Sequence, residues 1–195
     1  MKIAVGGPPG SGKSTISFLL SEWLTLPVYS LDDYREKSYQ QWGYSPKTAE
    51  SILKQKGALA LHHYESKFEL RALEHILKLN KSFIIDLSGG VLFQHGIKNK
   101  RRLYVALTKI NLLLLASPTK NGLNNAINIL KDRIEKRENG CEYVDHWIKF
   151  GGIDFLRKIV NITLDISKKN NVIYIDTENF EENFLLETLQ LFFKE

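Results

Sequence analysis

The stretch Gly7-Pro8-Pro9-Gly10-Ser11-Gly12-Lys13-Ser14 decides the fold, and it directly follows a short apolar segment, Lys2–Gly6. It matches the pattern G-x-x-x-x-G-K-[ST] in full. Glycines let the backbone wrap so that several N–H groups point into one anion-sized hollow, and the helix that follows presents its positive end there. With a strand before it and a helix after it, this stretch predicts a phosphate-binding loop.

The polar residues of the loop predict which phosphates it binds. Lys13 supplies a mobile charge for the β- and γ-phosphates of ATP, and Ser14 supplies a hydroxyl for Mg²⁺. The residues that we assign to the nucleotide here are Gly7, Gly10, Ser11, Gly12, Lys13, Ser14 and Thr15. ATP and Mg²⁺ are therefore the expected cofactors.

Composition and length fit a single domain over residues 1–195. The chain is 43% hydrophobic and 25% charged, with a formal net charge of +5. A basic balance occurs both in nucleic-acid binders and in enzymes that grip phosphorylated ligands, so it does not choose between them. The one cysteine, Cys141, excludes an internal disulfide and a multi-cysteine metal site. No apolar run approaches the ~20 residues of a membrane span and no signal peptide is evident, so we expect a cytoplasmic protein without a membrane partner.

Strand-like segments alternate with helical patterns along the chain. The expected strands are Lys2–Gly6, Leu26–Ser30, Ser82–Asp86, Ile110–Ala116 and Val172–Asp176. The expected helices are Lys13–Leu24, Thr48–Leu79 with an interruption at Gly57, Asn124–Glu138, Ile153–Lys169 and Phe180–Phe193. This alternation predicts an α/β fold, a three-layer α/β/α P-loop domain with a five-stranded parallel sheet. Ligands in such sheets bind beyond the carboxyl ends of the strands.

Carboxylates that could take part in phosphoryl transfer stand at two of these strand ends. Asp32 and Asp33 follow the second strand, where they could orient an acceptor hydroxyl and accept its proton, or cap the next helix. Asp86 ends the third strand, where a carboxylate that supports Mg²⁺ belongs, although it could also cap the next turn. Ser14 and Asp86 are therefore the predicted metal site.

A helical insertion at about 33–80 is expected to bind the acceptor. On its long helix, Arg71 and Glu74 share a face at i, i+3, as a substrate-anchoring pair or as an ordinary surface ion pair. After the third strand, Ser88-Gly89-Gly90 permits close backbone approach to a substrate.

Cations that could stabilise the transferring phosphoryl group lie near residue 135. Arg133 and Arg137 occupy the last turns of a helix, where they could fold over the nucleotide or complement the helix C-terminus. Residues 139–152 follow as a plausible lid with a hinge at Gly151-Gly152. Thr177 follows the last strand, where we expect a loop beside the adenine.

Taken together, these residues resemble the shikimate kinase branch of the small P-loop kinases over nearly the whole chain. The likeness lies in Gly7–Thr15, Asp32, Arg71-Ala-Leu-Glu74, Ser88-Gly89-Gly90, Ala116-Ser117-Pro118 and Ile175-Asp176-Thr177. The resemblance implies that Asp32 binds the acceptor, together with Arg71, Glu74, Gly89 and Gly90. The chain departs from that family where Ser30 and Ser88 replace an aspartate and a glycine, and where Glu138-Asn139-Gly140 replaces its lid motif. These departures leave the acceptor open.

The leading functional prediction is Mg·ATP-dependent phosphorylation of a hydroxyl on a small metabolite, with Lys13, Asp32 and Arg137 as catalytic residues. The chain has no Asn-Lys-x-Asp motif, which a GTPase would need, and its length suits a compact kinase. One alternative is a polynucleotide or nucleotide kinase, because Asp32-Asp33-Tyr34-Arg35 looks like a segment of phage-type polynucleotide 5′-kinases. We assign Asp33 and Arg35, with Asp32, to the residues that bind the acceptor; a nucleic-acid partner is possible but not favoured. The other alternative is a regulator that binds ATP without transferring phosphate.

Overall fold

The computed structural model describes residues 1–137, 141–169, 172–180, 186–187 and 190. Its centre is a parallel sheet of five strands in the order β2-β3-β1-β4-β5. The strands are β1 (Lys2–Gly6), β2 (Val28–Ser30), β3 (Phe83–Asp86), β4 (Leu112–Ser117) and β5 (Val172–Asp176). The predicted α/β fold with a five-stranded parallel sheet is confirmed.

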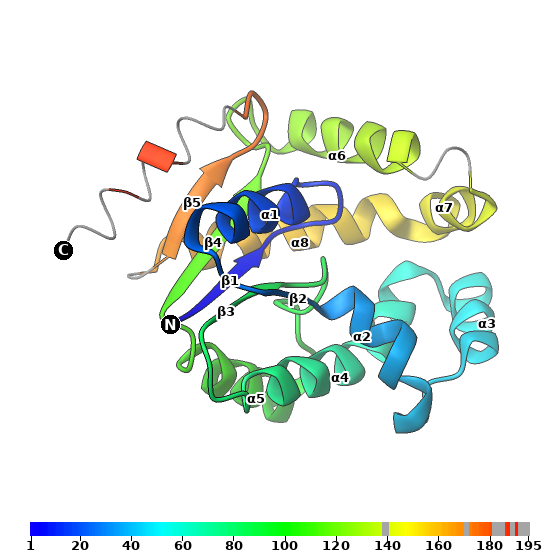
Figure 1. The fold of residues 1–195 in the computed structure, drawn as a ribbon. Helices are drawn as coiled ribbons and strands as arrows, with labels where there is room; N and C mark the ends of the chain where they lie inside the picture. Colours follow the sequence, from blue (N-terminus) through cyan, green and yellow to red (C-terminus); the bar gives the residue numbers. More distant parts are fainter. Residues whose placement is uncertain (138–140, 170–171, 181–185, 188–189, 191–195) are drawn as a thin grey trace.

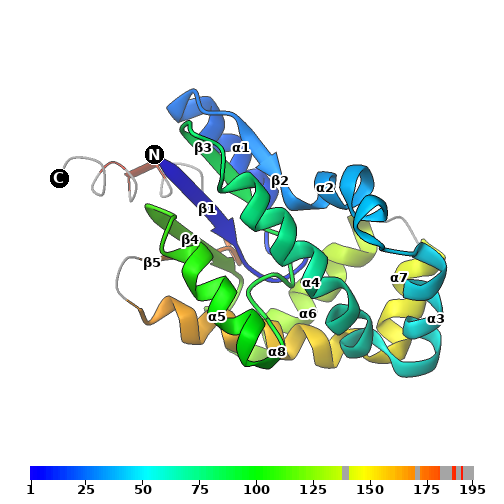
Figure 2. The same cartoon turned by 90° about the horizontal axis from the view of Figure 1, so that it is seen from below.

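Helices cover both faces of this sheet (Figures 1 and 2). They are α1 (Lys13–Leu24), α2 (Leu31–Ser38), α3 (Pro46–Lys56), α4 (Ala58–Ile76), α5 (Gly96–Leu107), α6 (Leu123–Arg137), α7 (Glu142–Trp147) and α8 (Ile153–Ser167). A 3-10 turn, η1 (Gln40–Trp42), precedes α3, and a π-helical turn, η2 (Ile148–Gly152), joins α7 to α8.

Alternate strand residues face the two layers. Ile3 and Val5 pack with Ile16 and Leu20 of α1 in one buried cluster. Ala4, between them, belongs to the cluster that β3 and β4 form with α4 and α5 on the opposite face. Because both faces are covered, the central strands β1, β3 and β4 are buried and mostly apolar, as expected of a buried parallel sheet. Among the described residues, no helix is both long and apolar enough to cross a membrane.

The region expected to be one long helix forms two. Gly57 ends α3 with a φ of +81°, and its N–H donates to the carbonyl of Leu53 at 3.0 Å. Ser45 caps the start of α3, because its side chain accepts a hydrogen bond from the N–H of Thr48. The interruption predicted at Gly57 is therefore confirmed.

Other boundaries differ from the sequence prediction. Helices α5 and α7 were not among the expected helices, and most of the expected C-terminal helix Phe180–Phe193 lies outside the described residues. The cap of α2 is Ser30, whose side-chain oxygen accepts a 3.2 Å hydrogen bond from the N–H of Asp32. Asp32 and Asp33 therefore occupy the first turn of α2 and do not cap it.

Candidate active site

The predicted phosphate-binding loop packs against the end of β4 and against α6. Gly7 has a φ of +144°, and a Cβ added there would lie 2.1 Å from the carbonyl oxygen of Ala116 in β4. Gly10 has a φ of +77° and approaches the backbone of Leu130 in α6. Side chains at these positions would meet both steric and conformational resistance. The predicted loop geometry therefore depends on its glycines.

Lys13 is buried at the start of α1, and its Nζ donates a 3.1 Å hydrogen bond to the carbonyl of Pro8 in the same loop. Burial lowers the pKa of Lys13, and the nearby carboxylates of Asp86 and Asp32 oppose that shift. The ammonium thus lies inside the loop with two carboxylates near it.

Ser14 and Asp86, the predicted metal site, are in direct contact. The hydroxyl of Ser14 donates to Oδ2 of Asp86 at 2.7 Å, and the other carboxylate oxygen, Oδ1, is buried with no hydrogen-bond partner among the described residues. Burial raises the pKa of Asp86, whereas Ser14 and Lys13 lower it. A hydroxyl and an orphaned carboxylate oxygen fit Mg²⁺, which prefers oxygen ligands and few protein groups. The described part of the chain contains no group of three or more His, Cys, Asp or Glu side chains that could hold a metal ion.

A cavity of about 490 Å³ extends from this loop into the space between the sheet end, α4 and α7. Its polar lining includes Lys13, Asp32, Arg35, His62, Glu65, Glu69, Ser88 and Arg137, and its apolar lining includes Val144, Trp147 and Phe155. Gly89 and Gly90 line it through their backbone. The structure therefore gathers Lys13, Asp32, Arg35, Gly89, Gly90 and Arg137, all predicted site residues, around one space.

Arg71 and Glu74 lie elsewhere, which corrects their expected place at the acceptor. The guanidinium of Arg71 lies 4.7 Å from the ring centroid of Trp42, and the carboxylate of Glu74 accepts two hydrogen bonds from Arg102, at 2.8 and 2.6 Å. They line a separate cavity. The reason is the direction in which each side chain leaves α4. His62, Glu65 and Glu69 lie on the face of the helix that lines the first cavity. Arg71 follows Glu69 by two residues and therefore lies on the opposite face. Asp33 is exposed and does not line the acceptor cavity either.

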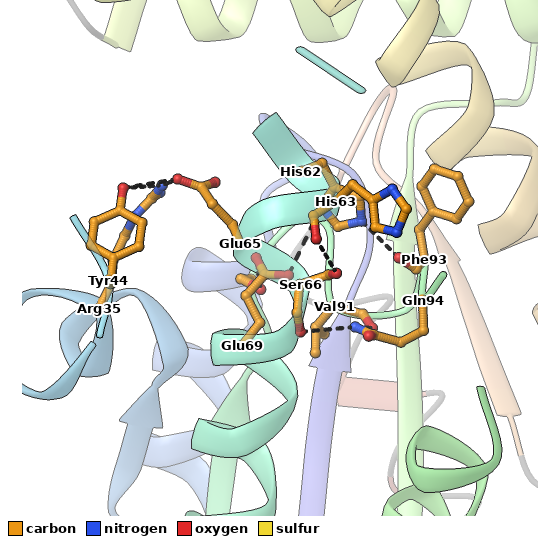
Figure 3. Close-up of polar contacts among 11 residues, drawn as sticks. Arg35, Tyr44, His62, His63, Glu65, Ser66, Glu69, Val91, Phe93 and Gln94 are labelled. Atoms are coloured by element: carbon orange, nitrogen blue, oxygen red, sulfur yellow. Dashed lines mark hydrogen bonds and ion pairs between the residues drawn. The ribbon is translucent and has the colours of Figure 1, made fainter. Parts of the chain in front are cut away.

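The inward face of α4 carries functional candidates that the sequence analysis missed. Glu65 forms an ion pair with Arg35 of α2 and accepts a 3.0 Å hydrogen bond from the hydroxyl of Tyr44 (Figure 3). One turn further, Oε1 of Glu69 accepts a 2.8 Å hydrogen bond from Ser88. The sequence does contain one signal for these residues. The spacing of His62, Glu65 and Glu69 places three ionisable side chains on one stripe of an otherwise apolar helix face.

His62 and Glu69 have strongly perturbed acidities because they are buried. Burial raises the pKa of Glu69 to about 7 and lowers the pKa of His62 to about 4. Nε2 of His62 lies 2.6 Å from the carbonyl oxygen of Phe93, which can only accept, so Nε2 carries the proton. Nδ1 of this neutral ring then faces Oε2 of Glu69 at 4.0 Å. Glu69 is therefore largely protonated and neutral below pH 7, and His62 is largely neutral above pH 4. Between these values both groups are largely uncharged in the folded protein.

Arg133 and Thr177, both predicted to bind the nucleotide, are in contact with each other. Arg133 of α6 donates to the carbonyl of Thr177 at 2.6 Å and approaches its hydroxyl at 3.4 Å. Asp176, before it, accepts hydrogen bonds from the backbone N–H groups of Thr119 and Lys120 at 2.8 and 2.7 Å. These bonds tie the loops after β4 and β5 to α6, at the edge of the phosphate loop.

The predicted lid begins outside the described residues, and its described part is α7 and η2. Tyr143, Val144 and Trp147 of α7 line the cavity. The turn after α7 departs from helical geometry at Phe150 (φ −98°, ψ 38°) and at Gly151 (φ +92°). The expected hinge position thus coincides with a break in the helix, and closure of a lid stays a prediction.

Solved structures of several kinases share this fold. A shikimate kinase from Acinetobacter baumannii is 16% identical, with 99% of this chain and 93% of that chain covered and a TM-score of 0.61. A deoxyadenosine kinase from M. mycoides is 16% identical, with 100% and 98% covered and a TM-score of 0.58. A gluconokinase from Sinorhizobium meliloti 1021 is 12% identical, with 100% and 97% covered and a TM-score of 0.56. Comparison with protein-family models and with curated protein sequences gave no match. The chain therefore has the fold of the small P-loop kinases, as the resemblance predicted.

Proposed function

We propose that this protein is an Mg·ATP-dependent kinase that phosphorylates a hydroxyl group of a small metabolite. The observation that carries the proposal is the contact between Ser14 and Asp86 beside Lys13, at a cavity that Lys13 and Asp32 both line. This arrangement supports the proposal because a phosphate donor held at Lys13 and a hydroxyl held at Asp32 would share one space, as in-line transfer requires.

In the proposed reaction, the acceptor hydroxyl attacks the γ-phosphorus of ATP. The new oxygen–phosphorus bond forms as the bond from that phosphorus to the β–γ bridging oxygen breaks, which leaves ADP. Asp32 orients the hydroxyl and takes its proton. Lys13 and Arg137 stabilise the negative charge on the phosphate oxygens during transfer.

Ser14 and Asp86 would hold Mg²⁺ at this site. When bound, the ion neutralises charge on the β- and γ-phosphate oxygens. Arg133 and Thr177, which are joined by hydrogen bonds, would lie on the adenine side of the nucleotide.

The test is a phosphotransfer screen with [γ-³²P]ATP over shikimate, gluconate, sugars, nucleosides and 5′-hydroxyl oligonucleotides. Transfer to a small hydroxyl compound is expected, and Lys13→Met should abolish it. Lys47→Met removes an equal charge from an exposed position on α3 and should leave it unchanged. If Lys13→Met retains full transfer, or if the wild-type protein binds ATP but labels no member of the panel, the kinase proposal fails.

A further inference from the structure

The acceptor side of the cavity is richer in acidic side chains than in basic ones. Asp32, Glu65 and Glu69 line it, and Arg35 is the basic side chain among the described lining residues on that side. The other two lining cations, Lys13 and Arg137, are on the phosphate side, since Lys13 is in the loop and the charge of Arg137 lowers its pKa. ATP and its metal would occupy that side in the proposed function.

The charge of Arg35 is already balanced within the protein. Its guanidinium pairs with Glu65, which is mostly buried, and lies 5.8 Å from the ring centroid of Tyr44. Tyr44 donates its hydroxyl to the same Glu65 oxygen. A ligand carboxylate that approached Arg35 would have to compete with this pair, and it would also meet the charge of Glu65 itself.

Glu69 has an unused acceptor atom in the same wall. The side chain is buried, Ser88 occupies Oε1, and Oε2 has no hydrogen-bond partner among the described residues. A buried oxygen without a partner is costly, and a ligand hydroxyl that donates to it would remove that cost.

Another part of the lining, packed against Ala58 and Leu61 of α4, is aromatic. Trp147 and Phe155 line the cavity in an edge-to-face pair with ring centroids 5.9 Å apart. Such faces suit the C–H surface of a ring-shaped polyol, whereas the acidic stripe of α4 suits its hydroxyl groups.

We infer that the acceptor is an uncharged, ring-shaped polyhydroxyl compound without a carboxylate or phosphate, whose hydroxyls donate to Glu65 and Glu69. This inference rests on the proposed function, because it assigns the second substrate of that site. It names Glu65 as the residue that determines selectivity: by neutralising Arg35, Glu65 excludes acidic acceptors.

The experiment compares matched ligands that differ in one charged group: glucose with glucuronate, methyl shikimate with shikimate, and adenosine with AMP. Binding is measured by ligand-observed NMR in the presence of Mg·ADP, which requires no turnover. The wild-type protein should bind the uncharged member of a pair more tightly. Glu65→Gln, which leaves the charge of Arg35 unbalanced, should raise affinity for the acidic members about tenfold, the effect of one like charge removed from a partly buried site.

Glu74→Gln is the matched control, because Glu74 also pairs with an arginine but lies outside this cavity. It should leave every affinity unchanged. The inference is overturned if the wild-type protein prefers an acidic member, or if Glu65→Gln binds the acidic ligands no better than Glu74→Gln does. Binding of uncharged ligands without any phosphate transfer would instead sink the proposed kinase reaction and leave the charge selectivity in place.

Discussion

The hydroxyl of Ser14 lies 2.7 Å from Oδ2 of Asp86, a residue 72 positions later in the chain. The sheet register brings them together: Val5, the penultimate residue of β1, pairs with Asp86 at the end of β3, and the phosphate loop leaves β1 immediately afterwards. Carboxyl ends of neighbouring parallel strands share one edge, so two short motifs distant in sequence form one site.

The first prediction concerns Asp86. Asp86→Asn should raise the Mg²⁺ concentration needed for half-maximal phosphotransfer by about 10- to 100-fold, because one of the two predicted oxygen ligands loses its charge. A magnesium titration at saturating ATP measures this. Asp165→Asn, which removes an exposed carboxylate from α8, should behave like wild type. An unchanged magnesium requirement in Asp86→Asn would mean that the metal is held elsewhere.

The second prediction separates two adjacent carboxylates. Both side chains are exposed, but Asp32 lines the cavity and Asp33 does not. Asp32→Asn should lower kcat on the order of 10²- to 10⁴-fold through loss of general-base catalysis, with little change in the KM for ATP. Asp33→Asn removes the same charge one residue away and should change kcat much less. Equal losses in the two variants would point to the net charge of the α2 N-terminus and not to a base.

The fold and the phosphate end of the site could be predicted because they depend on local sequence. The loop Gly7–Ser14, the strand end at Asp86 and the glycine pair after β3 each carry their geometry in consecutive residues. The alternation of strands and helices then fixes which edge they share.

The acceptor end was harder because it depends on helical phase. A spacing of three residues shows that Arg71 and Glu74 share a face but does not show which face of α4 is inward. Glutamate and histidine are usually exposed, so Glu65, Glu69 and His62 carried no signal of burial on their own. Their position became evident only once α4 was packed against the sheet and against α2.

The third prediction follows from the outward position of Arg71. Arg71→Ala removes a cation–π contact with Trp42 and should cost about 0.5–1 kcal/mol of unfolding free energy. The KM for the acceptor should not change, because the side chain lies in another cavity. Arg35→Ala, in contrast, leaves Glu65 unpaired in the acceptor cavity and should change that KM. Steady-state kinetics measure the KM values, and denaturant unfolding measures the stability. A raised acceptor KM in Arg71→Ala would mean that Arg71 does contact the acceptor.

The fourth prediction is a pH dependence of stability caused by Glu69. Burial raises its folded-state pKa to about 7, above the unfolded value of 4.5, so the folded protein binds this proton more tightly. The contribution of Glu69 is therefore fully favourable below pH 4.5 and is lost as the pH rises through 7. His62 acts in the opposite direction at lower pH, since its folded pKa of about 4 lies below the unfolded 6.5 and its contribution is lost as the pH falls.

Glu69→Gln isolates the first of these effects. The amide oxygen can still accept the hydrogen bond from Ser88, but no proton is released, so the variant should gain stability over wild type on the order of 2 kcal/mol at pH 8 and little at pH 5. Urea unfolding at the two pH values measures the difference. Glu74→Gln is the control, because the carboxylate of Glu74 pairs with Arg102 near the surface. Its difference in unfolding free energy from wild type should not increase between pH 5 and pH 8. If Glu69→Gln gains the same unfolding free energy over wild type at pH 5 and at pH 8, the carboxyl group of Glu69 does not titrate across this range.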